Sequence, residues 1–168
     1  TDHAETEINV LAADARIEAL FAFVEGMTPR LRAELIELNE IPAPPFGEAQ
    51  RGLRFATMLR AAGLDDVWID DEGNVIGRRP GRNGERVIAY TAHLDTVFPA
   101  ETDVTVRVDG DTLYAPGIGD NTRGLVVLLA VLRALEHGHI ETNADILFVG
   151  KVGEEGHGDM RGTKHLFR

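Results

Sequence analysis

The sequence contains no cysteine, which excludes both a disulfide framework and a metal site built from thiolates. It is also poor in positive charge, because 17 Lys and Arg stand against 28 Asp and Glu, a formal net charge of −11. Phosphate binding requires clustered Lys and Arg, so this balance argues against nucleic acid or an anionic membrane as a partner. The longest apolar run, Leu125 to Leu132, is far shorter than the roughly 20 residues of a membrane-spanning helix.

The composition is that of a globular domain. The 168 residues are 43% hydrophobic and 27% charged, enough for one domain with its own core. Residues 1–5 lack the basic and apolar regions of a secretory signal peptide, so we expect a cytoplasmic location, although the absence of cysteine is equally compatible with a periplasmic or secreted protein.

Helical spacing of apolar residues predicts four helices. The first is expected over residues 9–25, and the second begins at Thr28-Pro29 and ends near Asn39, before a proline-rich stretch. A third helix is expected from Glu48 to Ala62 with Gly63 as its stop, and a fourth from Leu125 to Glu136, closed by Gly138.

The remaining apolar segments predict strands. Residues 67–69 and 74–77 form an expected hairpin, and the alternating valines of 104–108 with Leu113-Tyr114 form another at the surface. The continuous apolar runs 87–92 and 144–149 are typical of strands buried on both faces. Together with the helix between them they predict a βαβ unit and an α/β fold with a mixed, largely parallel sheet and flanking helices. Ligands of such sheets bind at the carboxyl ends of the strands.

Three groups of acidic and imidazole side chains follow these elements directly. His93 and Asp95, two residues apart on an extended segment, point to the same side, so one can bind a metal while the other ligates or orients the imidazole. Alternatively, His93 is a strand-end histidine satisfied by its neighbour.

Asp120 lies in the glycine-rich turn 117–124, just before the helix that starts near Thr122. Its carboxylate could cap that helix, in competition with Asn121 and Thr122. It could also bridge two cations, as a two-metal site requires.

Glu154 and Glu155 come next to each other after the second apolar strand. Neighbours in an extended segment face opposite ways, which suits one metal ligand and one general base. A solvated acidic turn is the alternative.

The ordered trio His-x-Asp, Gly-x-x-Asp and Glu-Glu-Gly resembles the co-catalytic zinc peptidases and amidohydrolases of the M20 family, from about residue 30 to the end. The resemblance implies that His93 and Glu155 each bind one of two Zn²⁺ ions, which Co²⁺ or Mn²⁺ could replace. It implies that Asp120 bridges the two ions, that Asp95 orients His93, and that Glu154 is the general base.

This chain departs from the family pattern in two ways. Thr122 occupies the position of a usual lysine, and the 168 residues contain no counterpart of a further carboxylate ligand and a late histidine ligand. His157 and His165 lie too close to the Glu-Glu pair to replace these ligands, and we expect them at the surface. We expect His137 and His139, at a helix end, to bind no metal.

Residues 1–168 are therefore expected to be the N-terminal portion of a zinc catalytic domain, without the lid or dimerisation domain and the rest of the catalytic domain. The resemblance implies a hydrolase of small peptides, with an N-acyl amino acid deacylase or a non-catalytic metal- or peptide-binding module as alternatives, and a homodimer of the full-length protein. A sheet that lacks later strands would leave an open edge prone to association.

Overall fold

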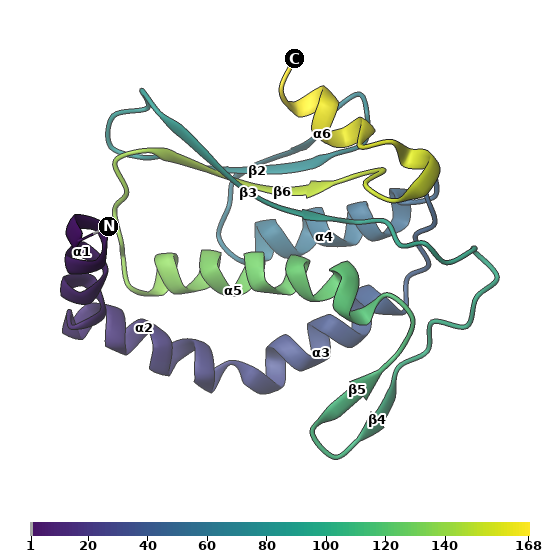
Figure 1. Cartoon of the computed structure of the whole chain (residues 1–168), viewed down its shortest axis with the longest axis horizontal. Helices are drawn as coiled ribbons and strands as arrows, with labels where there is room; N and C mark the ends of the chain where they lie inside the picture. The colour runs from purple at the N-terminus through teal and green to yellow at the C-terminus, as the bar shows by residue number, and fades with distance from the viewer. Residues whose placement is uncertain (1) are drawn as a thin grey trace.

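A computed structural model describes residues 2–168 and contains a four-stranded mixed sheet (Figure 1). The strands are β1 (Asp66–Ile69), β2 (Val75–Arg79), β3 (Val87–His93) and β6 (Asp145–Lys151), in the spatial order β1-β2-β6-β3. β3 and β6 are parallel, whereas β1 with β2 and β2 with β6 are antiparallel. The predicted mixed α/β fold is confirmed, with a larger antiparallel share than the sequence suggested.

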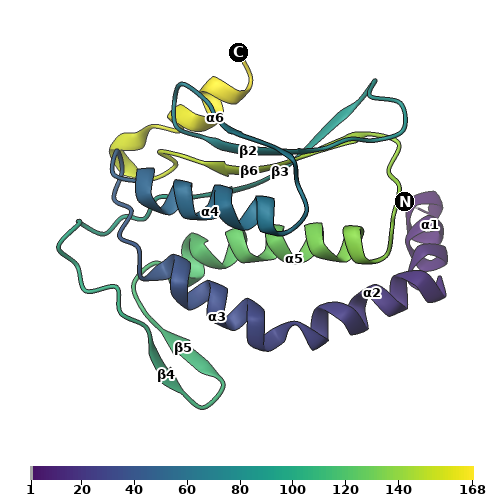
Figure 2. The ribbon, with the colours of Figure 1, turned by 180° about the vertical axis from the view of Figure 1, so that it is seen from behind.

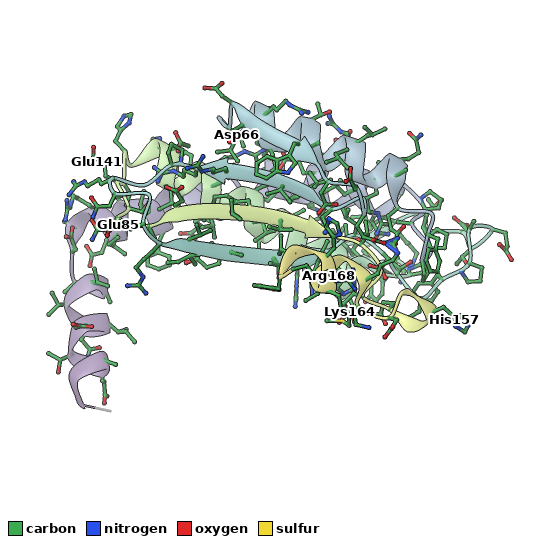
Figure 3. All side chains as sticks on the ribbon, turned by 90° about the horizontal axis from the view of Figure 1, so that it is seen from above. Asp66, Glu85, Glu141, His157, Lys164 and Arg168 are labelled. Atoms are coloured by element: carbon green, nitrogen blue, oxygen red, sulfur yellow. The ribbon has the colours of Figure 1, made fainter. Side chains whose placement is uncertain are left out.

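Helices lie in two layers below one face of the sheet. The bounds are α2 (Ala15–Gly26), α3 (Thr28–Asn39), α4 (Ala49–Ala61) and α5 (Arg123–His137). The helices α4 and α5 lie next to the sheet, and α2 and α3 lie beyond α5, as the front and rear views both show (Figures 1 and 2). The short helix α6 (Arg161–Leu166) lies on the opposite face (Figure 3). A hairpin of β4 (Arg107–Asp109) and β5 (Thr112–Tyr114) projects from the body.

The core lies between the sheet and its adjoining helices. Phe55 and Leu59 of α4, Leu125 and Leu129 of α5, and Phe148 of β6 are all fully buried. Burying each of these side chains contributes about 1.5–3 kcal/mol. This apolar layer fixes the position of α5 against β3 and β6, and thereby the turn that carries Asp120.

The first predicted helix is wrong in its extent. The chain forms α1 (Asp2–Ala12) and then α2, with a break at residues 13–14. Asp14 caps α2, since its carboxylate accepts a hydrogen bond from the Arg16 main-chain N–H at 2.8 Å. Apolar spacing continues through this break, which is why periodicity alone did not find it.

The expectation that residues 87–92 are buried on both faces is also wrong. Val87, Ile88 and Tyr90 are 58%, 44% and 45% exposed, and only the last two residues of β3 are buried. β3 is one of the two edge strands of the described sheet, so only β6 pairs with it. A continuous apolar run indicates that a strand can be buried. It does not show whether the strand has neighbours on both sides in the sheet.

The other predicted helices and strands are confirmed to within about two residues, a usual scatter for element ends, except that β4 begins at Arg107, three residues after the predicted start at 104. Gly63 follows α4 with φ +113°, and Gly138 is the C-cap of α5. None of the described helices combines the length and the hydropathy needed to cross a bilayer.

Candidate metal centre

The predicted site residues lie around the carboxyl ends of the parallel strands β3 and β6. His93 is the last residue of β3 and pairs in register with Lys151, the last residue of β6. Glu154 and Glu155 follow β6, and Asp120 lies at a kink with non-helical backbone angles inside η1 (Ile118–Thr122), the segment that leads into α5. The parallel arrangement of the two strands brings these separate segments to one end of the sheet.

Three side chains converge on one point. His93, Glu154 and Glu155 each offer a ligand atom, and these three atoms lie within 4.8 Å of one another. The Glu154 Oε2 atom is 3.8 Å from His93 Nε2, and Asp120 Oδ1 is 2.9 Å from the same nitrogen. Imidazole and carboxylates are the ligands that zinc takes in catalytic sites, so this donor set fits a zinc ion. Asp120 adds a fourth group at the rim, with a side chain that is 78% exposed.

Asp95 is fully buried and contacts both His93 and the backbone of the two glutamates. Its main-chain oxygen accepts a hydrogen bond from His93 Nδ1 at 2.9 Å, and its carboxylate Oδ1 lies 3.6 Å from that nitrogen. The carboxylate also accepts hydrogen bonds from the backbone N–H groups of Glu154 and Glu155, at 3.0 and 2.8 Å. With its proton on Nδ1, a neutral His93 directs the lone pair of Nε2 toward Asp120 and Glu154.

The charges at this end of the sheet are unbalanced. Burial and the neighbouring charge of Glu154 raise the pKa of Glu155. Burial opposes ionisation of His93, but hydrogen bonds with Asp95 and Asp120 outweigh it and raise the pKa of His93 to about 9. Burial also opposes ionisation of Asp95, yet His93 and the two amides hold the pKa of Asp95 below its usual value. Several carboxylates facing one imidazole favour a bound cation.

The two glutamates do not point apart as expected for an extended segment. One carboxylate oxygen of Glu154 and one of Glu155 both lie within 4.8 Å of a ring nitrogen of His93. The segment is a loop and not a strand, because the flanking Gly153 and Gly156 have φ +60° and +48°. The positive φ angles turn the chain so that neighbouring side chains can converge.

Helix capping does not account for Asp120. α5 has Thr122 at its N-cap, with no side-chain hydrogen bond to the helix. The hydroxyl of Thr122 instead hydrogen-bonds Asn39 Oδ1 at 3.1 Å and the main-chain oxygen of Gly117 at 3.0 Å. Thr122 is fully buried, and its hydroxyl group joins the turn to α3. A lysine at this position could not make the same hydrogen bonds without burying its charge.

Sequence reasoning missed a buried arginine behind the site, Arg51. Arg51 donates to the main-chain oxygens of Asn39, Ile41 and Leu94, which ties α4 to the segment between His93 and Asp95. Burial lowers the pKa of Arg51 to about 10, although the charge of Asp95 opposes this shift. A sequence signal existed, because Arg51 lies four residues before Phe55 on the apolar face of its helix.

The other histidines whose side chains the structure describes lie outside the cluster. The His137 ring stacks on Phe23, with ring centroids 3.9 Å apart. His157 is exposed, as expected, and His165 is half-buried, 3.9 Å from a carboxylate oxygen of Asp70.

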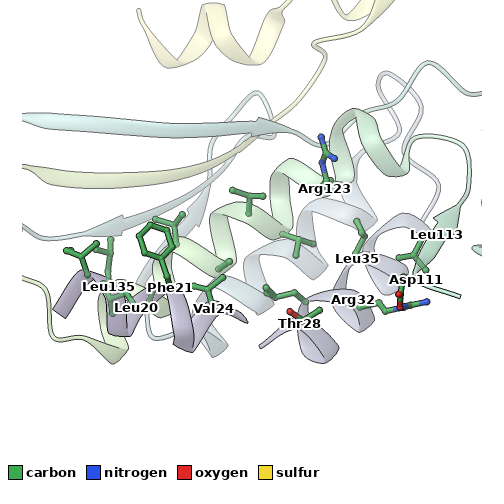
Figure 4. A pocket seen from close by; sticks show the side chains of 17 residues that line it. Leu20, Phe21, Val24, Thr28, Arg32, Leu35, Asp111, Leu113, Arg123 and Leu135 are labelled. Atoms are coloured by element: carbon green, nitrogen blue, oxygen red, sulfur yellow. The ribbon is translucent and has the colours of Figure 1, made fainter. Parts of the chain in front are cut away.

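A separate groove of about 760 Å³ lies between α2, α3 and α5 (Figure 4). Its lining is mostly apolar, with Leu20, Phe21 and Val24 from α2 and Leu35 from α3. The five predicted site residues do not line it, so the chemistry and the groove belong to different parts of the molecule.

Residues 74–168, which carry all five predicted site residues, match peptidase family M28. The chain belongs to this family. M28 and M20 are zinc-peptidase families of one clan, so the resemblance seen in the sequence is confirmed at the level of that clan. The family consists of metallopeptidases that are generally zinc-dependent.

Similar proteins carry the names of hydrolases and peptidases. A putative LysW-lysine/LysW-ornithine hydrolase of Pyrococcus abyssi is 35% identical over 122 residues, 73% of this chain and 32% of the relative. Carboxypeptidase G2 of a Pseudomonas species is 31% identical over 84 residues, 49% of this chain and 20% of the relative. The crystal structure of aminopeptidase PepT from Bacillus cereus has a TM-score of 0.68 and 25% identity, covering 81% of this chain and 39% of PepT. The chain thus spans about a third of the length of such relatives.

Proposed function

We propose that this chain carries the metal-binding part of a zinc-dependent hydrolase of peptide and other amide bonds. The observation that carries the proposal is the convergence of His93, Glu154 and Glu155 within 4.8 Å, with Asp120 on the same imidazole nitrogen. Membership of a peptidase family supports the chemistry, and the names of the relatives support a peptide or related amide substrate.

In this proposal the site holds two Zn²⁺ ions, which Co²⁺ or Mn²⁺ can replace. His93 would hold one ion and Glu155 the other, with the Asp120 carboxylate as a ligand common to both. When bound, the zinc ions activate a water molecule and polarise the scissile carbonyl group. Asp95 orients His93 through its main-chain oxygen and holds the backbone of both glutamates through its carboxylate.

Glu154 is the general base of the proposal. Its carboxylate takes a proton from the attacking water, whose oxygen forms a bond to the carbonyl carbon. The same carboxylate then delivers the proton to the leaving nitrogen as the C–N bond breaks. Its neighbour Glu155 would be a ligand and would not move protons.

The substrate we propose is a small peptide, with an N-acyl amino acid as the second candidate. Residues 1–168 would be the N-terminal portion of the catalytic domain, which agrees with the third of the relatives' length that they cover. The homodimer of the full-length protein and its cytoplasmic location stay predictions.

Zinc content per chain tests the metal site directly. We expect elemental analysis to find zinc, about two ions per chain, in the wild type and its loss in Asp120→Ala. Asp109→Ala is the matched control, because Asp109 is an exposed carboxylate of the β4–β5 hairpin and does not belong to the cluster. A wild-type chain without zinc would contradict the proposed site.

Hydrolysis assays test the roles of the two glutamates. In the full-length protein, on a panel of small peptides and N-acyl amino acids, Glu154→Gln should abolish turnover while zinc stays bound, whereas Glu155→Gln should lose zinc. Unchanged turnover in Glu154→Gln would exclude Glu154 as the base. Zinc binding without hydrolysis of either substrate class would favour a non-catalytic metal- or peptide-binding module.

A further inference from the structure

The loop that carries the two glutamates is held by side chains from distant parts of the chain. We call residues 152–155 the ligand loop. Its four consecutive backbone N–H groups all donate to side-chain oxygens: Val152 to Asn74 Oδ1 at 3.0 Å, Gly153 to Glu48 Oε1 at 3.1 Å, and Glu154 and Glu155 to Asp95 at 3.0 and 2.8 Å. Asp95 belongs to the site already described. Glu48 and Asn74 do not contact the converging ligand atoms.

These hydrogen bonds replace those of the sheet. β6 ends at Lys151, so the ligand loop has no strand ladder to fix its direction. A buried N–H group without a partner costs about 1–3 kcal/mol, which disfavours any conformation that breaks one of the four bonds. Because the backbone direction sets where the next side chains point, these acceptors also set the aim of Glu154 and Glu155.

Glu48 is directed at the loop and not at its own helix. It occupies the N-cap position of α4 but makes no side-chain capping hydrogen bond there. It is 3% exposed, and both of its carboxylate oxygens accept from Arg161 Nη2, at 2.8 and 2.9 Å. Arg161 lies at the start of α6, after the ligand loop, and its side chain and that of Glu48 both lie next to Gly153. A Cβ atom on Gly153 would lie 2.7 Å from the Arg161 side chain.

Asn74 holds the other end of the loop. It is fully buried, and its amide nitrogen donates to Asp70 Oδ2 at 2.8 Å and to the main-chain oxygen of Gly162 at 3.0 Å. A Cβ atom on Gly162 would lie 2.3 Å from Asn74 Oδ1, so only glycine permits this approach. Asn74 therefore joins the β1–β2 turn, the ligand loop and α6 at a single point.

We propose that Glu48 and Asn74 are positioning residues, which fix the ligand loop and thereby place Glu154 and Glu155 for metal binding and proton transfer. The part of this inference that concerns metal binding and proton transfer rests on the proposed function. The holding of the loop itself can be measured without metal.

The test compares Glu48→Ala, Glu48→Gln and Asn74→Ala in the 168-residue chain. Two properties are measured: amide hydrogen exchange of residues 152–155 without metal, and affinity for Co²⁺ from its visible absorption. In Glu48→Ala we expect the Gly153 amide to lose its protection and Co²⁺ affinity to fall about 10–100-fold, the usual loss when a group that orients a ligand is removed. Asn74→Ala should expose the Val152 amide and weaken Co²⁺ binding in the same range.

Glu48→Gln separates positioning from ion pairing. Glutamine keeps an oxygen for the Gly153 N–H but removes the charge that pairs with Arg161. If Glu48 positions the loop, Glu48→Gln keeps most of the Gly153 protection and Co²⁺ affinity. If Glu48 is only the counter-ion of Arg161, glutamine is as damaging as alanine, and the proposal fails for this residue.

Asp145→Ala is the matched control. Asp145 is also a buried carboxylate that accepts from one arginine, Arg78, and one glycine N–H, that of Gly81, but it lies at the other end of β6. We expect this variant to lower the melting temperature without changing exchange in the ligand loop or Co²⁺ affinity.

Should Glu48→Ala fail to fold, the double variant Glu48→Met with Arg161→Met removes the acceptor without leaving a buried charge unpaired. Wild-type exchange at Gly153 in either variant would overturn the positioning role. If the wild-type chain binds no Co²⁺ while the variants show the expected exchange changes, the metal site is refuted and the role of Glu48 and Asn74 in holding the loop is retained.

Discussion

The two ends of the parallel pair β3–β6 use similar residues for different purposes. At the amino end, Asp145 begins β6, and its carboxylate accepts from Arg78 and the Gly81 N–H. At the carboxyl end, Asp95 is equally buried and accepts from two backbone N–H groups, with Arg51 close behind. Both aspartates have a pKa held below the usual value, by the Gly81 N–H and Arg78 for Asp145, and against the effect of burial by His93 and the amides for Asp95.

The difference lies in what surrounds each aspartate. Around Asp145 the charges are matched, and the adjoining residues of β3 are apolar and exposed. Around Asp95, in contrast, the imidazole of His93 and three carboxylates, those of Asp120, Glu154 and Glu155, lie close together. Buried polar groups that pair with one another indicate a structural role. Several carboxylates that converge on one point indicate a site for a cation.

Exchanging each aspartate for asparagine should give the largest contrast. In Asp95→Asn the amide cannot accept from both loop N–H groups in the same way, so we expect zinc affinity to fall about 10–100-fold. Asp145→Asn should leave zinc affinity unchanged while lowering thermal stability. Competition with a chelator of known affinity measures both, and equal losses in the two variants would remove the distinction between the two ends.

Arg51→Met should destabilise the carboxyl end through the backbone that Arg51 supports. The main-chain oxygens of Asn39, Ile41 and Leu94 would lose their donor in a buried place, so we expect a loss of about 3 kcal/mol in the free energy of unfolding. Urea denaturation measures this loss. Arg16→Met is the control, because the Arg16 side chain is 79% exposed and its removal should cost less than about 0.5 kcal/mol. Similar losses in both variants would show that Arg51 is not an anchor.

Ile88→Lys should have the smallest effect on folding and act on association. Ile88 lies on the edge strand β3 and is 44% exposed, and a lysine on such an edge discourages pairing with another strand. We expect less self-association in sedimentation experiments, with the free energy of unfolding changed by less than about 0.5 kcal/mol. Val108→Lys, on the exposed hairpin strand β4, is the control and should leave association unchanged. Equal association in Ile88→Lys and the wild type would show that the β3 edge is not the contact.

Much of the local structure could be predicted because it depends on neighbours in sequence. Thr28-Pro29 begins α3, Gly63 follows α4, and the acidic turn joins β1 and β2, as their residue types indicate. The candidate site residues were found in the same way, since each group follows a recognisable strand or glycine-rich turn. The break at Asp14 was missed because the apolar spacing on either side of it happens to continue.

By itself, the sequence determined the α/β class, most helices and strands, and the short motifs that contain His93, Asp95, Asp120, Glu154 and Glu155. The tertiary structure alone decided that β3 lies at an edge, that two adjacent glutamates converge, and that Arg51, Glu48 and Asn74 support the site. The reason is physical: helix periods and turn preferences act over a few residues, whereas a buried hydrogen bond joins groups as much as 105 positions apart. Such partners become recognisable only when the fold has removed both from water.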